Sequence, residues 1–242
     1  MAVYTQVSFD EASVLLDSLQ LGQLQSMEGC SGGIENTNYF VTTDSGAYVL
    51  TLFERLSAEQ LPFYLRLMKH LATAGIPVPK PAADTSGALM YTVNGKPATV
   101  VNRLRGKSEL APQPEHCASV GAWLAKMHGV GQSFDLQQPN LRGLAWWNDT
   151  VPVILPFLQA SQQSLIEGEL AYQNHVAESS VYAALPRGPI HADLFRDNVM
   201  FAPSSNDGGS ALEMTGFFDY FTHPGISERG NSRVTQIGRA HV

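Results

Sequence analysis

Cysteine is scarce in this chain, and its scarcity excludes two kinds of structure. The 242 residues include only Cys30 and Cys117, which lie far apart and form neither a Cys-x-x-Cys pair nor a Cys/His ligand pattern. A disulfide framework or a zinc site needs paired or closely spaced cysteines. We therefore expect a protein of a reducing compartment, the cytoplasm.

Long apolar runs and an excess of positive charge are also missing. No apolar stretch approaches the roughly 18 residues that cross a bilayer, and the N-terminus lacks a basic segment followed by an apolar one. The formal net charge is −7, whereas nucleic-acid binders cluster Lys and Arg. We expect a soluble, unexported globular protein with no nucleic-acid, membrane or obligate protein partner. A local phosphate pocket is compatible with this charge.

The first hundred residues have the pattern of a small antiparallel sheet with one inserted helix. A first helix is expected over residues 10–20, and the inserted helix over 57–74, where it begins at Ser57 or at Pro62. Asp44-Ser45-Gly46 and Asn94-Gly95 are hairpin signals. The strands expected around these turns are 38–43, 47–55, 88–93 and 97–104.

Beyond Gly106 the pattern becomes helical. A helix is expected over 115–130 and a further long helix over 152–185, followed by strands at 198–201 and 212–221. The predicted fold class is α+β and bilobal, with a β-rich N-lobe and a mainly helical C-lobe. The expected domains are residues 1–102, residues 103–221 and an atypical tail, 222–242, which has neither helical nor strand periodicity.

The segment HADLFRDN, residues 191–198, crowds polar side chains against an apolar strand. His191, Asp193 and Asn198 have the H-x-D-x-x-x-x-N spacing of a phosphotransferase catalytic loop. In such a loop the Asp orients the attacking hydroxyl and takes its proton, and the Asn oxygen faces a metal ion. A hairpin after Asn198 would return a second carboxylate, Asp219, to that metal. We expect His191 to hold the loop backbone.

A glycine-rich turn, SGGIENTNYFV, precedes the first predicted hairpin. Gly32 and Gly33, followed by Asn36, would let backbone N–H groups approach phosphate oxygens closely. Two glycines are by themselves most often only a turn. Their place in the chain, before the sheet, a linker and the polar loop, is the order of parts in a kinase.

With these stretches the chain resembles the aminoglycoside phosphotransferase-like kinases, and among them the bacterial homoserine kinases of the ThrB type. The resemblance covers residues from about 20 to 221. It implies the protein-kinase-like fold of that superfamily. The segments that carry it are GGIENTNYFV, YVLTLFER, LPFYLRLMKHLATAGIPVP, GKPATVVNRLRGK, NLRGLAWWNDT and GPIHADLFRDNVMF.

The resemblance implies ATP and Mg²⁺ as cofactors and phosphorylation of the hydroxyl of L-homoserine, giving O-phospho-L-homoserine for threonine biosynthesis. It implies that Asp193 is the catalytic base, that Asn198 and Asp219 are magnesium ligands, and that Gly32 and Gly33 cover the phosphates. The adenine would meet the linker near Val101 and Arg103. The candidates for binding the α-carboxylate and α-ammonium of the substrate are Arg142, Arg196 and Asp197.

The chain departs from the family pattern in two places. Where kinases of this fold place a lysine on the third strand, this chain has Thr51, and Arg55 shares the face of Thr51 by strand parity. The tail 222–242 lacks the acidic, aromatic stretch and helices of the family. We therefore expect an incomplete C-lobe with uncovered apolar faces and a non-native or disordered tail.

Other functions compete with homoserine phosphorylation. A related kinase could act on choline or ethanolamine, with Trp146 and Trp147 as an aromatic cage, or on an aminoglycoside-like acceptor. A second alternative is an inactive fragment that binds nucleotide without transferring phosphate. A third is a metal-dependent hydrolase with His191, Asp193 and Asp219 as ligands, but its surroundings supply too few His/Asp pairs.

Overall fold

The computed structural model describes residues 3–30, 36–138, 140, 143–191, 193–204 and 212–218. The described residues form two compact units. The first runs to Val130 and resumes at Leu194, and the second covers Gly131–Asp193. The predicted lobe boundary after residue 102 falls inside the first unit and stays a prediction. The tail 222–242 lies outside the described residues.

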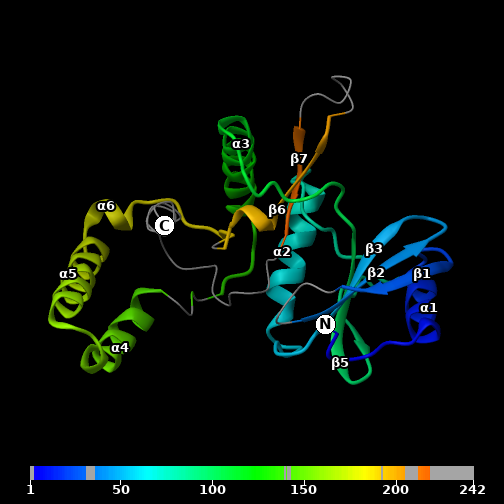
Figure 1. The fold of residues 1–242 in the computed structure, drawn as a ribbon, viewed down its shortest axis with the longest axis horizontal. Helices are drawn as coiled ribbons and strands as arrows, with labels where there is room; N and C mark the ends of the chain where they lie inside the picture. The colour runs from blue at the N-terminus through cyan, green and yellow to red at the C-terminus, as the bar shows by residue number, and fades with distance from the viewer. Residues whose placement is uncertain are drawn as a thin grey trace. The chain divides into compact units, whose positions relative to one another are not determined.

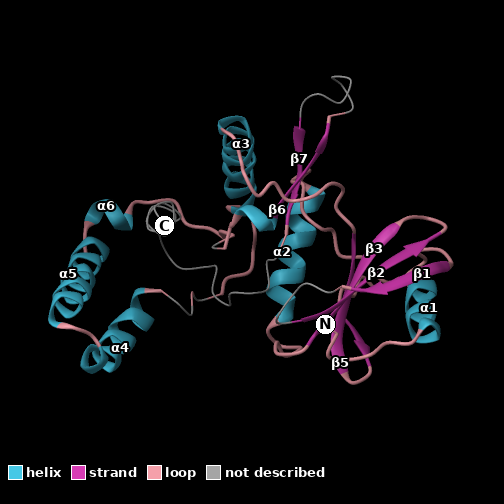
Figure 2. Ribbon diagram, viewed as in Figure 1, coloured by secondary structure: helices cyan, strands magenta, loops and turns pink. Residues whose placement is uncertain are grey.

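A five-stranded antiparallel sheet forms the N-terminal part of the first unit (Figures 1 and 2). Its strand order is β1-β2-β3-β5-β4, and the predicted turns join its neighbouring strands, with Asn94 and Gly95 both at positive φ. The strands are β1 (Leu24–Gly29), β2 (Asn36–Thr43), β3 (Ala47–Phe53), β4 (Tyr91–Val93) and β5 (Lys96–Asn102). This sheet and the helices confirm the α+β fold class.

One face of the sheet packs on α1 (Phe9–Ser18), which begins with a capping box between Ser8 and Glu11. Alternate residues of β2 are buried, as expected for a strand with one covered face. The core under α1 joins buried side chains from the helix and the central strands, namely Ala12, Leu16, Tyr39, Val41, Leu50, Leu52, Ala98 and Val100.

The helix α2 (Leu61–Thr73) is inserted between β3 and β4 and is buried along most of its length. It begins at Leu61, so Pro62 stands in the first turn, where its missing N–H leaves no hydrogen bond unmade. Of the two expected starts, Ser57 and Pro62, the observed start is thus within one residue of Pro62. Gly75, at φ +82°, follows the helix end.

The rest of the first unit consists of α3 (Pro114–Gly131) and a two-stranded hairpin, β6 (Val199–Pro203) and β7 (Leu212–Phe217). A backbone hydrogen bond connects the hairpin to the segment after α2: the Phe217 N–H donates to the Pro77 carbonyl at 2.9 Å. Phe217 is fully buried. The short turn η2 (Arg196–Asn198) leads into β6.

The second unit contains α4 (Leu144–Ile154), a 3₁₀ turn η1 (Leu155–Phe157), α5 (Ala160–Ala177) and α6 (Ser180–Ala183). The expectation of one long helix over 152–185 is wrong. Pro156 lacks the N–H that would continue a helix, and Gln159 starts a new helix with a capping box to Gln162.

The helices α4 and α5 lie side by side (Figure 1), joined by Asn148 and Asn174, whose side-chain amides donate to each other at 3.1 and 2.9 Å. Among the described residues, no helix is long and apolar enough to cross a membrane.

Candidate functional site

The loop 191–198 carries three buried polar side chains. His191, Asp193 and Asn198 are only 2%, 9% and 8% exposed. The other buried polar side chains are threonines of the N-terminal sheet. A solvated turn would expose such groups, because burying a polar side chain costs free energy unless hydrogen bonds replace those to water. The burial therefore favours a site over a surface turn.

The end of β7 is brought next to Asn198 by the hairpin. Val199 pairs with Phe217, and the N–H of Phe218 donates to the Asn198 carbonyl at 3.1 Å. The N–H of Asn198 itself donates to the Phe195 carbonyl at 3.0 Å and closes the η2 turn. The predicted return of the chain to Asn198 is thus present up to Phe218. Asp219, the next residue, lies outside the described residues.

Asp193 closes the second unit, and the first unit resumes at Leu194. Asp193, the carboxylate predicted to be the catalytic base, is therefore the last residue of the second unit before the chain returns to the first. Ala192, between His191 and Asp193, lies outside the described residues. The side chains of His191 and Asp193, on either side of it, are both buried.

Two side chains tie the loop to the segment that follows the linker. Arg196 Nη1 donates to the Leu110 carbonyl at 2.9 Å, and Ser108 Oγ donates to the Asp197 carbonyl at 2.9 Å. The side chains of Arg196 and Asp197 are exposed. Sequence reasoning missed Ser108 and Leu110, because a side-chain bond to a distant carbonyl leaves no signal in residue spacing.

The residues predicted to meet the nucleotide lie at the ends of the central strands. Asn36 is the first residue of β2. Val101 of β5 is 7% exposed and pairs with Val49 of β3. The Arg103 guanidinium stacks 4.0 Å from the centre of the Phe40 ring. Gly32 and Gly33 lie outside the described residues, as does Arg142.

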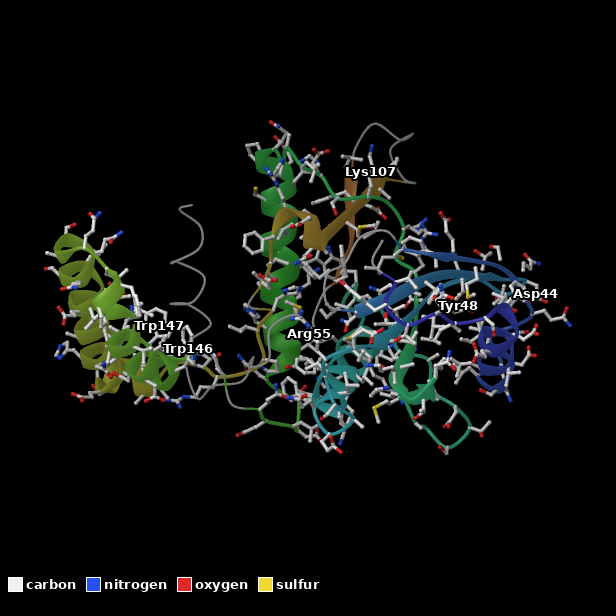
Figure 3. The ribbon with its side chains drawn as sticks, turned by 60° about the horizontal axis from the view of Figure 1, so that its bottom comes forward. Asp44, Tyr48, Arg55, Lys107, Trp146 and Trp147 are labelled. Carbon is white, nitrogen blue, oxygen red and sulfur yellow. The ribbon has the colours of Figure 1, made fainter. Side chains whose placement is uncertain are left out.

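The position of the absent strand lysine is occupied by a neutral pair. Thr51 Oγ1 donates to Asn38 Oδ1 at 2.7 Å across β2 and β3, where the two residues are cross-strand partners. This bond turns the amide oxygen of Asn38 toward Thr51. Arg55 lies beyond the end of β3 and is exposed (Figure 3).

Glu54, directly after β3, is the carboxylate that joins three strands at this end of the sheet. It accepts from Thr37 Oγ1 at 2.8 Å and pairs with Lys96 Nζ at 3.1 Å. Burial raises the pKa of Glu54, but hydrogen bonds from threonines and the Lys96 ammonium outweigh it, so the pKa lies below its usual value. The Glu54 carboxylate thus connects the end of β3 to β2 and β5 through Thr37 and Lys96.

The donor chemistry of the loop fits a hard divalent cation. Asn198 offers an amide oxygen in a nearly buried position, and carboxylate and amide oxygens are the ligands that Mg²⁺ takes. Among the described residues, no three His, Cys, Asp or Glu side chains gather to hold a metal. Asp219, the third ligand that the hydrolase alternative requires, lies outside the described residues.

Trp146 and Trp147 are consecutive residues in α4, 39% and 37% exposed (Figure 3). Successive side chains of an α-helix point about 100° apart, so these two indoles do not face each other across a cation. The geometry does not favour the aromatic cage that a choline kinase would need.

Comparison with known proteins agrees with the loop chemistry. The model of the phosphotransferase enzyme family matches residues 26–220. A homoserine kinase of Polaromonas naphthalenivorans (strain CJ2) is 66% identical over 221 residues, which are 91% of this chain and 67% of that protein. A homoserine kinase of Paraburkholderia phytofirmans is 52% identical with the same coverage. The chain spans about two thirds of the length of these curated relatives.

Solved structures show the same fold at low sequence identity. The amicoumacin kinase hAmiN, in complex with AMP-PNP, Ca²⁺ and Ami, has a TM-score of 0.60 at 19% identity, covering 88% of this chain and 64% of its own. A putative aminoglycoside phosphotransferase from Ralstonia eutropha has a TM-score of 0.60 at 17% identity, covering 89% and 65%. Together with the family match over residues 26–220, these findings confirm the predicted resemblance, and the chain belongs to the phosphotransferase enzyme family.

Proposed function

We propose that this chain transfers the γ-phosphoryl group of ATP to the hydroxyl of L-homoserine, giving O-phospho-L-homoserine in the cytoplasm. The observation that carries the proposal is the burial of the Asp193 and Asn198 side chains in the loop 191–198, with the end of β7 hydrogen-bonded beside Asn198. The relatives named homoserine kinase, at 66% and 52% identity, support the choice of acceptor.

In this proposal Asp193 orients the acceptor hydroxyl and takes its proton as the phosphoryl group arrives. Asn198 and Asp219 hold Mg²⁺. Support for this pair comes from Phe218, which precedes Asp219 and donates its N–H to the Asn198 carbonyl at 3.1 Å. A magnesium ion bound there would neutralise charge on the phosphate oxygens.

The nucleotide would lie under the sheet. Val49 and Val101 are paired across β3 and β5 and offer an apolar surface to the adenine, next to the linker backbone that begins at Arg103. Gly32 and Gly33 would cover the phosphates. The neutral pair of Thr51 and Asn38 replaces a lysine, so neutralisation of the phosphates depends more heavily on the metal.

The acceptor has an α-carboxylate and an α-ammonium, which need partners of opposite charge. Arg142 and Asp197 are the candidates that we retain for these roles. Arg196 already donates to the Leu110 carbonyl and is assigned differently below. Trp146 and Trp147 do not form the aromatic cage that choline would need, because neighbouring side chains of α4 point in different directions.

The experiment is ADP release by the purified chain with Mg-ATP and L-homoserine, run beside choline and a no-acceptor control, with mass spectrometry to identify the product. We expect release that depends on homoserine and a fall of about 10²- to 10⁴-fold in Asp193→Asn, which keeps the shape but removes the base. Asp17→Asn, at an exposed position on α1, is the matched control and should leave the rate unchanged.

Two results would contradict the proposal. Folded chain that binds ATP but releases no ADP with homoserine would support the nucleotide-binding alternative. Full activity in Asp193→Asn would show that the base lies elsewhere.

A further inference from the structure

The segment Gly106–Leu110, here named the splint, runs along the loop that leads into β6 (Figure 3 labels Lys107 beside the hairpin). Lys107 and Phe201 exchange both backbone hydrogen bonds, each 2.9 Å long. Gly106 allows this approach because a Cβ at its position would lie 2.0 Å from the Phe201 carbonyl oxygen, and its φ is +92°. The splint therefore depends on a glycine at its first residue.

Two further bonds attach the splint to the residues directly before Asn198. Arg196 reaches the Leu110 carbonyl and Ser108 reaches the Asp197 carbonyl, both at 2.9 Å. Together with the Phe201 pair, these contacts lie on both sides of Asn198 in the sequence. The three attachments fix the backbone that carries the Asn198 side chain.

The same splint continues from the strand and linker assigned to the adenine. Val101 lies in β5, which ends at Asn102. The linker follows the strand, and the splint begins at Gly106. The linker is also attached to the hairpin, since Thr215 Oγ1 donates to the Arg105 carbonyl at 2.6 Å. The nucleotide-facing strand and the metal-facing loop are thus connected by a short run of backbone with hydrogen bonds along its length.

We propose that the splint sets the position of Asn198 relative to the nucleotide, and that Arg196 is a positioning residue that holds the loop on the splint, not a ligand of the substrate. This inference rests on the proposed function for its kinetic readout. It assigns Arg196 by its contact with a main-chain carbonyl, where the motif alone had suggested a contact with substrate.

The test compares Arg196→Ala, Arg196→Lys and Ser108→Ala with the control Arg187→Ala, at an exposed position outside the splint and the linker. In Arg196→Ala we expect kcat to fall about 10- to 100-fold, the range that corresponds to one hydrogen bond from a charged donor. The Mg²⁺ concentration for half-maximal activity should rise, and KM for homoserine should stay unchanged. Arg196→Lys keeps a donor and should recover part of kcat, and Arg187→Ala should behave as the unmodified chain.

A second readout does not need turnover. Amide hydrogen exchange of residues 194–201 should be faster in Arg196→Ala and Ser108→Ala and unchanged in Arg187→Ala. A higher KM for homoserine with kcat preserved would make Arg196 a substrate ligand and overturn the inference, as would unchanged exchange in both loop variants. Absence of homoserine-dependent turnover in the unmodified chain would refute the proposed function alone, because the exchange measurement still decides the splint.

Discussion

Replacement of Gly106 by alanine tests how closely the splint approaches the hairpin. The added Cβ would lie 2.0 Å from the Phe201 oxygen, 2.6 Å from its carbonyl carbon and 3.1 Å from the Ala202 nitrogen. All three are backbone atoms, so no side chain can move aside. The residue also keeps a φ of +92°, which disfavours any L side chain.

The expected loss has two parts. The left-handed backbone costs an alanine about 1–2 kcal/mol. The clash separates Lys107 from Phe201, and each of their two hydrogen bonds contributes about 0.5–1.5 kcal/mol. We therefore expect Gly106→Ala to lower the free energy of unfolding by about 2–5 kcal/mol, which is a large share of the stability of a typical domain.

Two other glycines provide the controls. Gly95 has a φ of +74° with no atom within 4 Å of an added Cβ, so Gly95→Ala should lose only the conformational part, about 1–2 kcal/mol. Gly121, inside α3, also has open space, and alanine there should gain about 0.5–1 kcal/mol from helix propensity.

The assay is urea unfolding, with the free energy taken from the midpoint and slope. Of the three tryptophans of the chain, Trp146 and Trp147 belong to the second unit. A background with both changed to phenylalanine leaves Trp123 of α3 to report the first unit. A loss in Gly106→Ala no larger than that in Gly95→Ala would refute the close contact.

Further outcomes follow from single contacts. Ser8→Ala removes the capping box of α1 and should lower the free energy of unfolding by about 1 kcal/mol in the same assay. Burial lowers the pKa of His128, whose Nε2 has no hydrogen-bond partner among the described residues. The unfolded chain therefore takes up the proton first as the pH falls below about 6.5, and this loss of stability, measured as Tm at pH 7.5 and 5.5, should be smaller in His128→Gln. Thr51→Val frees the Asn38 amide and should raise KM for ATP with little change in KM for homoserine, whereas equal changes in both would contradict a role at the nucleotide.

Local patterns predicted much of the fold because their causes are local. The turns at Asp44-Ser45-Gly46 and Asn94-Gly95 join the expected strands, since both offer residues that tolerate turn geometry. The helix expected over 115–130 is present as α3, Pro114–Gly131. The prediction of one long helix over 152–185 was wrong. The apolar spacing continues through Pro156, but the helical backbone hydrogen bonds are interrupted there.

The site was predictable only in part. The spacing of His191, Asp193 and Asn198 indicated the loop, and the structure buries all three side chains. The splint contacts join residues 86 and 89 positions apart, Arg196 to Leu110 and Ser108 to Asp197. Such bonds need only a donor and any carbonyl, so the identity of the accepting residue leaves no trace in the sequence.

The route of the chain through the hairpin governs the order in which the first unit can be completed during synthesis. Gly216 lies against Leu104 and Pro77, with an added Cβ only 2.4 Å from a Leu104 methyl, and the next residue, Phe217, is fully buried. The N-terminal sheet can form once residue 102 has left the ribosome, whereas this three-way junction has to wait for Phe217. Until then the nascent chain exposes the apolar surface that Phe217 will cover, over the whole time needed to make the second unit. Chaperone binding during translation is therefore expected to concentrate in that interval and to end as β7 emerges.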